Sequence, residues 1–361
     1  MMKSKTLLIA MMAMVASAMT FTSCSDDDDD VTNNYTTYQS KVDAQVREQK
    51  KNDKAILLVA FGSTWQQAFK AFDTTVAEYK NANPGYDVYL SFSSAICINR
   101  AAAGEHANDE GEDKAEIRNY YAPNFWLHAL GNVKYSEIVV QSLQVIPGEE
   151  YSRVINYIKD FANNSLGDLD DAYLSKVNLK LGTPLLNNMD DVKNAAKVLN
   201  ALYADKAAKG VVAFMGHGNP DNYDTYKANI RYTQLEEALQ EYSPNYFVGT
   251  VDMPDNYKEN VLDRMREAGI TSGVMNVYPL MSIAGDHAHN DMAGEGEDYW
   301  DPNHEESEDN SWYEYFTHKG YSVTSNLVGL LECPTVRQLW ENHTKKPVEL
   351  EDYYHSMYPE E

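Results

Sequence analysis

The chain has 361 residues, enough for two domains, and 43% of them are hydrophobic, which is sufficient for a sizeable core. It carries 55 Asp and Glu against 30 Lys and Arg, a formal net charge of −25 at pH 7. This charge argues against nucleic acids and anionic membrane surfaces as partners, because phosphates are bound through Lys and Arg, whereas it attracts metal cations.

The N-terminus has the features of an export signal. Lys3 and Lys5 precede an apolar segment, residues 7–21, which has the length of a signal peptide and is short for a bilayer span. Cys24 and a run of aspartates, residues 26–30, follow it. This arrangement resembles a bacterial lipoprotein signal with Cys24 as the lipidated residue. The Asp-rich tract resembles the surface-export signal of Bacteroidetes lipoproteins.

These features predict a signal peptide over residues 1–23 and an exported lipoprotein at the outer membrane, on its periplasmic side or at the cell surface. An ordinary secretory signal, cleaved near Ala18, is the alternative. Residues 24–51 are polar and lack periodicity, so we expect a flexible acidic tether there.

Short apolar runs alternate with amphipathic stretches along the rest of the chain. The predicted strands are residues 55–61, 86–92, 137–143, 177–181, 210–214, 246–251, 273–280 and 321–324. The predicted helices include residues 149–162, 190–203, 257–268 and 335–343. This alternation predicts an α/β fold of two similar lobes, each a mainly four-stranded parallel sheet flanked by helices, with a cleft between them. We place the lobes at residues 52–207 and 208–346, followed by an acidic tail, residues 347–361.

The two sets of strands form a weak internal repeat. Residues 58–63 resemble residues 211–217, and residues 140–149 resemble residues 278–286. The loops of the first half carry Ser63 and Glu149, whereas those of the second half carry histidines. A metal site would therefore rest mainly on the C-terminal half and face the cleft.

His217 and His287 are the strongest candidates for metal ligands. Each lies in a glycine-flanked turn shortly after a predicted strand. Ligands of α/β proteins bind at the carboxyl ends of strands, and imidazole is the commonest metal-binding side chain. Asp286 and Asp291 are placed to fix the orientation of a ligating imidazole, although Asp286 is equally suited to cap a helix. His289 flanks the same turn.

Two other features bear on the site. Residues 294–311 are strongly acidic, which predicts either a solvated loop or a funnel for cations beside His287. Cys97 and Cys333 remain besides Cys24, with no CxxC pair, so neither a disulfide framework nor a thiolate metal site is expected. Cys97 lies in an apolar run and is predicted to be a core residue.

Several motifs occur in a fixed order and together resemble the anaerobic sirohydrochlorin cobaltochelatase family, a branch of the class II tetrapyrrole chelatases. The resemblance extends from about residue 54 to residue 343, and it is carried by residues 57–63, 141–143, 148–151, 181–186, 212–218 and 279–292. It implies two α/β lobes around a tetrapyrrole cleft. It also implies insertion of Co²⁺ into sirohydrochlorin without ATP or another nucleotide.

The resemblance implies that His217, His287 and one acidic residue hold the metal. The acidic position is Asp252 here, where the family usually has Glu, and Gln144 stands where relatives often have His. Imidazoles and a carboxylate suit Co²⁺, Ni²⁺, Fe²⁺ or Zn²⁺. Histidine also suits removal of the pyrrole N–H protons, because its pKa lies near working pH.

Two classes of function stay open at this point. The first is a chelatase that inserts Co²⁺ into sirohydrochlorin. The second is a surface lipoprotein that captures haem or a similar ring for uptake, in company with an outer-membrane transporter. The export signal favours the second, whereas the two histidines with an acidic residue favour the first. A metal-storage or metal-sensing protein is a third, weaker interpretation.

Overall fold

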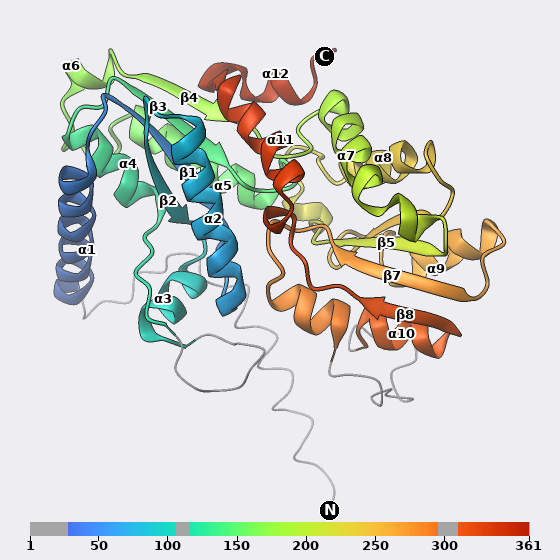
Figure 1. Ribbon diagram of the computed structural model, residues 1–361. Helices are drawn as coiled ribbons and strands as arrows, with labels where there is room; N and C mark the ends of the chain where they lie inside the picture. The colour runs from blue at the N-terminus through green and yellow to red at the C-terminus, as the bar shows by residue number, and fades with distance from the viewer. Residues whose placement is uncertain (1–27, 106–115, 295–309, 361) are drawn as a thin grey trace, which may run out of the picture. The chain divides into compact units, whose positions relative to one another are not determined.

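Two sheets form the framework, and their parallel strands follow the same order (Figure 1). The first has the order β2-β1-β3-β4-β9. Its parallel strands are β1 (Lys54–Ala60), β2 (Asp87–Phe92), β3 (Glu137–Ser142) and β4 (Asn178–Gly182), and the short β9 at its edge is antiparallel. The second has the order β6-β5-β7-β8, and its strands are β5 (Val211–Gly216), β6 (Tyr246–Thr250), β7 (Gly273–Pro279) and β8 (Tyr321–Ser325). The predicted α/β fold is confirmed, and the matching order supports the internal repeat.

The computed structural model describes residues 28–105, 116–294 and 310–360. Its α-helices are α1 (Asp28–Gln49), α2 (Gln66–Ala82), α3 (Ala95–Ala103), α4 (Pro123–Asn132), α5 (Glu149–Ala162), α6 (Asp171–Leu174), α7 (Met189–Ala207), α8 (Ile230–Gln240), α9 (Lys258–Glu267), α10 (Trp312–His318), α11 (Pro334–Lys345) and α12 (Tyr353–Met357). Among these described helices, none has the length and apolar character needed to cross a membrane. Cys24 and most of the acidic insert lie outside the described residues.

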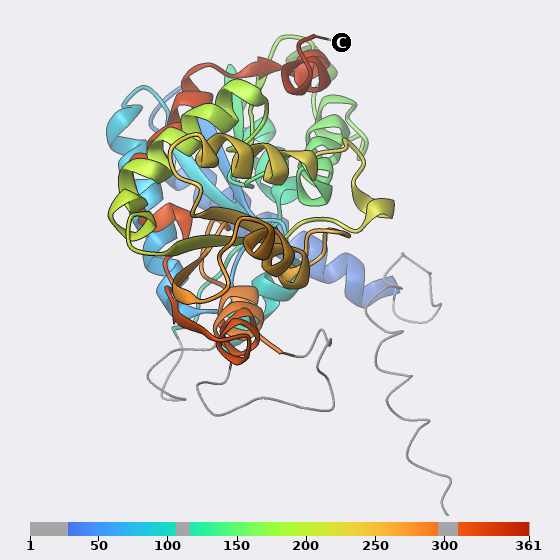
Figure 2. The ribbon, with the colours of Figure 1, turned by 90° about the vertical axis from the view of Figure 1, so that its right-hand side faces the viewer.

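Helix α7 packs on the second sheet, although we assigned its residues to the first lobe. Asn245 Nδ2 donates a hydrogen bond to the carbonyl of Ala207 at 2.7 Å, and the Tyr246 hydroxyl donates to Asn200 Oδ1 at 3.1 Å. Figure 2 shows α7 beside α8, with which it is in contact.

Helix α11 follows the last strand of the second sheet in the chain, but it packs on the first sheet. Trp340 Nε1 donates to the carbonyl of Gln144 at 3.1 Å, and Thr344 Oγ1 donates to Gln141 Oε1 at 2.7 Å. The predicted lobe boundaries are therefore corrected at both helices. An amphipathic pattern shows that a helix buries one face, but it does not show which sheet that face covers.

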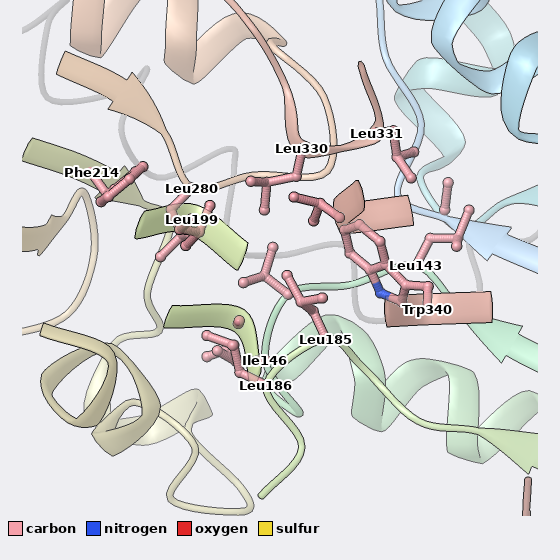
Figure 3. Close-up of a cluster of buried hydrophobic side chains, with 14 of the residues drawn as sticks. Leu143, Ile146, Leu185, Leu186, Leu199, Phe214, Leu280, Leu330, Leu331 and Trp340 are labelled. Carbon is pink, nitrogen blue, oxygen red and sulfur yellow. The ribbon is translucent and has the colours of Figure 1, made fainter. Parts of the chain in front are cut away.

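Both halves contribute to one hydrophobic cluster (Figure 3). It joins residues from the first sheet and its loops, from α7, from the second sheet and from the segment that leads into α11; they include Leu143, Leu185, Leu199, Phe214, Leu280, Leu330 and Trp340. Trp340 is its largest fully buried side chain. Because this core is continuous, it fixes the spacing between the carboxyl ends of the two sheets.

The structure also corrects both predicted ends of the folded part. The segment expected to be a flexible tether is largely the helix α1, in which Val42 and Val46 are completely buried. With the nearly buried Gln39 they form a helical stripe that the surrounding polar residues hide from a composition-based prediction. The predicted acidic tail is ordered as well. Its β9 (Val348–Glu349) pairs antiparallel with β4, and Met357 is buried.

Candidate functional site

A cavity of about 350 Å³ opens at the carboxyl ends of both sheets. Its walls come from the segments that follow β1, β2, β3, β5 and β7, so both halves of the repeat contribute. Most of its lining is apolar, with a few polar and titratable groups among them. These include Ser63, Gln144, Glu149, Glu150, His217, Asp286 and His287.

The structure brings His217 and His287 together. Their ring centroids are 4.6 Å apart and their planes are nearly perpendicular, at 83°. His217 Nε2 lies 3.6 Å from Asp252 Oδ2, so the three predicted ligands are neighbours. The described residues contain no group of three His, Cys, Asp or Glu side chains already converged around a point where an ion would sit. His217 is therefore adjacent both to His287 and to Asp252, but the three side chains do not converge on one point.

Each imidazole is oriented through its Nδ1 atom. His217 Nδ1 lies 2.7 Å from the carbonyl oxygen of Gly218, and His287 Nδ1 lies 2.6 Å from Asp291 Oδ2. Since a carbonyl and a carboxylate oxygen only accept, Nδ1 carries the proton in both rings. The Nε2 lone pairs are then left for a metal ion, the arrangement that metal-binding histidines commonly show.

The charge around His287 favours its protonated form. The hydrogen bond that His287 donates to Asp291 raises the pKa of His287, and the negative charges of Asp291, Asp252 and Asp286 raise it further, against the opposing effect of burial. A metal ion must therefore displace a proton more firmly held than that of a free imidazole.

Backbone hydrogen bonds show which residues of the two halves correspond. The amide of Ser94 donates to the carbonyl of Phe61 at 3.0 Å, as the amide of Asp252 donates to that of His217 at 2.8 Å. Phe61 and Ser94 are thus the counterparts of His217 and Asp252. The sequence-based comparison, which ends at Ser63 in one half and at His217 in the other, is corrected: the counterpart of His217 is Phe61.

The same comparison identifies the counterpart of His287. The amide of Leu143 donates to the carbonyl of Val59 at 2.9 Å, and the amide of Leu280 donates to that of Met215 at 2.7 Å. Counting seven residues onward from each leucine leads to Glu150 and His287. The sequence comparison ends one residue earlier in each half, at Glu149 and Asp286, and does not include Glu150.

Glu150 is the site residue that the sequence analysis missed. It lines the cavity, Ser93 Oγ donates to its Oε2 at 3.5 Å, and its Oε1 lies 3.5 Å from Arg153. Burial raises the pKa of Glu150, although the charge of Arg153 opposes the shift. The signal that could have found it is the repeat itself, aligned through the two leucines.

The remaining predicted residues take different positions around the cavity. Glu149 pairs with Arg153, and its amide donates to Asn219 Oδ1 at 2.9 Å. Ser63 is buried, and its Oγ accepts from the amide of Trp65 at 3.0 Å. Gln144 is buried, and its Nε2 has no hydrogen-bond partner among the described residues.

Two of the predicted groups bind across to the first half of the repeat. Asp286 accepts hydrogen bonds from Thr64 and Trp65, a role that neither of its predicted alternatives included. His289 is stacked on the Trp65 ring. Asp291 does contact the His287 ring, as predicted, and Cys97 is buried, as expected for a core residue.

Comparisons with known proteins agree on one family. The model of the cobalt chelatase (CbiK) family matches residues 54–349. The chain is 30% identical over 251 residues to the sirohydrochlorin cobaltochelatase CbiKC of Nitratidesulfovibrio vulgaris, covering 68% of this chain and 78% of that protein. It is 25% identical over 293 residues to the sirohydrochlorin cobaltochelatase of Salmonella typhimurium, covering 80% and 94%.

One solved structure has the same fold. SirB from Bacillus subtilis with Fe³⁺ aligns with a TM-score of 0.51 at 16% sequence identity, over 81% of this chain and 94% of that one. At this identity the likeness concerns the fold alone. It agrees with the two α/β halves seen here.

Proposed function

The chain belongs to the cobalt chelatase (CbiK) family, and on this premise we propose that it inserts Co²⁺ into sirohydrochlorin in the cavity between its two sheets. That it is a tetrapyrrole metal chelatase follows from the family and from its relatives. The observation that carries the proposed site is the pair of imidazoles, 4.6 Å apart, on one wall of that cavity.

The metal is a substrate in this reaction, and we assign its binding to His217, His287 and Asp252. Two neutral imidazoles and a carboxylate suit a borderline divalent cation such as Co²⁺, while Ni²⁺, Fe²⁺ and Zn²⁺ fit the same donors. A metal passed on to a ring must be held with coordination positions left open, as in catalytic rather than structural metal sites.

Insertion also releases two protons from pyrrole nitrogens, one for each N–H bond that is replaced by a bond to the metal. Glu150 lines the cavity from the first half of the repeat, whereas the two histidines come from the second half. Burial raises the pKa of Glu150. A carboxylate made more basic in this way is a suitable proton acceptor. Metal delivery from one half and proton removal by the other need no nucleotide.

Capture of haem without turnover, the alternative drawn from the export signal, is not favoured. A single axial ligand is sufficient for haem capture, whereas this cavity holds two imidazoles beside an acidic residue. Family membership points the same way.

Visible spectroscopy tests the proposal. The purified protein is mixed with sirohydrochlorin and Co²⁺ in one sample and with haem in another. We expect the spectrum of the free-base ring to be replaced by that of its cobalt complex, faster than in a sample without protein. A tight haem spectrum with no acceleration of cobalt insertion would contradict the proposal and support haem capture.

We further propose that Cys24 anchors the protein to the outer membrane as a lipid-modified residue, so that ring and metal are met outside the cytoplasm. The support is the sequence alone: the basic start, the short apolar segment and the aspartates after Cys24. An outer-membrane transporter would then be a natural partner. Cys24→Ala should release the protein from membranes, because stable anchoring needs several acyl chains at that residue. A protein found in the cytoplasm with Met1 intact would contradict export.

A further inference from the structure

The turn that carries His287 is held by residues of the other half of the repeat. Trp65, in the loop after β1, stacks on His289 with ring centroids 3.3 Å apart and planes within 5°. Its Nε1 donates a hydrogen bond to Asp286 Oδ1 at 2.6 Å, and Thr64 Oγ1 donates to the same oxygen at 2.9 Å. These contacts hold Asp286 and His289, which lie on either side of His287, and the His287 ring lines the cavity.

The backbone next to His287 has an unusual conformation that these contacts can stabilise. The segment that follows His287, residues Ala288–Ala293, is π-helical. Such turns are rare and occur frequently at functional sites, where neighbouring groups hold a geometry that an ordinary helix would not adopt. Asp291, within that segment, fixes the rotation of the imidazole, whereas Trp65 and Thr64 fix the position of the backbone that bears it.

A corresponding contact joins the first loop of the second half to the turn that carries Glu150 in the first half. Asn219, in the loop after β5, accepts a hydrogen bond from the amide of Glu149 at 2.9 Å, directly before Glu150. There is no room for a side chain at Gly148, since a Cβ atom there would lie 2.6 Å from Asn219 Nδ2. The first loop of each half therefore holds the turn that carries the other half's titratable group. Only the contact at His287 uses a large aromatic side chain.

We propose that Trp65 is a positioning residue for metal binding: through its contacts across the boundary between the two halves, it places His287 against His217. This inference rests on the proposed function and deepens it, because it makes the metal site depend on contact between the halves. The ring, which is bound by the cavity walls, does not depend on Trp65 in the same way.

Two substitutions separate the two contacts of Trp65. Trp65→Phe keeps an aromatic face for His289 and removes the N–H donor to Asp286, and Trp65→Ala removes both. With Co²⁺ alone as the probe, calorimetry should show Kd raised about 10-fold or more in Trp65→Ala, as for other groups that orient a metal ligand, and by less in Trp65→Phe. The free-base sirohydrochlorin Kd should stay within about 2-fold, below the losses typical of such groups.

Tyr242→Ala serves as the matched control, because Tyr242 is a half-exposed aromatic residue outside the cavity wall. It should leave both Kd values unchanged. Unchanged Co²⁺ affinity in Trp65→Ala would overturn the inference, and so would equal losses for metal and ring. If Trp65→Ala does not fold, unchanged Co²⁺ affinity in Trp65→Phe overturns it instead. Failure of the parent protein to bind Co²⁺ would contradict the proposed function rather than the role of Trp65.

Discussion

At the scale of single residues, equivalent positions of the two halves of the repeat carry different side chains in the cavity. His217 and His287 stand on one side, and their counterparts Phe61 and Glu150 stand on the other. The imidazole of His217 is thus matched by the apolar ring of Phe61, and that of His287 is matched by the carboxyl group of Glu150.

Asp252 is predicted to complete the metal site in spite of its short side chain. It lies 3.6 Å from His217 Nε2, close enough for one ion to be bound by both groups. Asp252→Ala should raise the Co²⁺ Kd by about 10-fold, and Asp252→Glu should preserve or lower it, because the longer carboxylate reaches further. Calorimetry with Co²⁺ measures both. If both variants bind like the parent, Asp252 is a loop residue without a metal-binding role.

Phe61 is predicted to stack on the tetrapyrrole ring. It lines the cavity, yet 46% of it is exposed, which is unusual for an aromatic residue at the end of a buried strand. Stacking of aromatic rings contributes about 0.5–1.5 kcal/mol beyond burial of area, so Phe61→Ala should raise the Kd of free-base sirohydrochlorin by roughly 10-fold. Absorbance titration without metal measures this. Phe61→Tyr should bind the ring normally, and the Co²⁺ Kd should not change in either variant; a change in metal affinity alone would disprove the assignment.

The histidines could be predicted from the sequence because their loops bear glycine on both sides and follow apolar runs. Asp252 came from its place after a predicted strand and from the family resemblance. Glu150 and Trp65 could not be found in this way. Glu150 required the register of the repeat to one residue, which only backbone hydrogen bonds reveal, and Trp65 acts through a contact with residues more than two hundred positions away.

At the scale of elements, strands were easier to predict than the partners of helices. All eight predicted strands occur, with ends shifted by one or two residues, since a buried parallel strand is a short continuous apolar run. Helices α7 and α11 were also predicted from their periodicity. Their exchange between sheets was not, because it depends on the path of the chain through space.

The junction made by this exchange contains a pH-sensitive group. His343 of α11 places Nδ1 3.1 Å from the carbonyl oxygen of Thr183 and Nε2 3.0 Å from Asp191 Oδ1 of α7. Both nitrogens face acceptors, which favours the doubly protonated ring. Burial lowers the pKa of His343, but the hydrogen bond and charge of Asp191 and the backbone carbonyls outweigh it, so the pKa is raised.

A pKa raised in the folded state stabilises the fold below the pKa of the unfolded chain, about 6.5, and this contribution is lost as pH rises through the folded value. The free energy of unfolding should therefore fall across that range in the parent protein. His343→Gln should show a smaller fall. Urea unfolding at a series of pH values measures both, and an equal or steeper fall in His343→Gln would rule out this role.

At the scale of the whole molecule, the two halves behave as parts of one folded unit. Residues 42–361 form a single compact unit, and the hydrophobic cluster around Trp340 draws on both sheets. The C-terminal segment, residues 347–360, contacts both halves. It pairs with β4 of the first sheet, and Arg231 of the second half donates a hydrogen bond to the carbonyl of Met357 at 2.7 Å. The composition of this segment predicted only an acidic tail, because its buried contacts depend on a few residues.

The central claim is that the two imidazoles deliver the metal while the cavity walls bind the ring. The double variant His217→Ala, His287→Ala tests this most directly, because it removes both imidazoles and leaves most of the wall in place. Mixed with sirohydrochlorin, it should give the visible spectrum of the bound free-base ring, and that spectrum should not change when Co²⁺ is added. Cobalt insertion at the rate of the parent protein would contradict the claim. So would complete loss of ring binding, which would make the histidines the anchor of the ring and favour capture through an axial ligand.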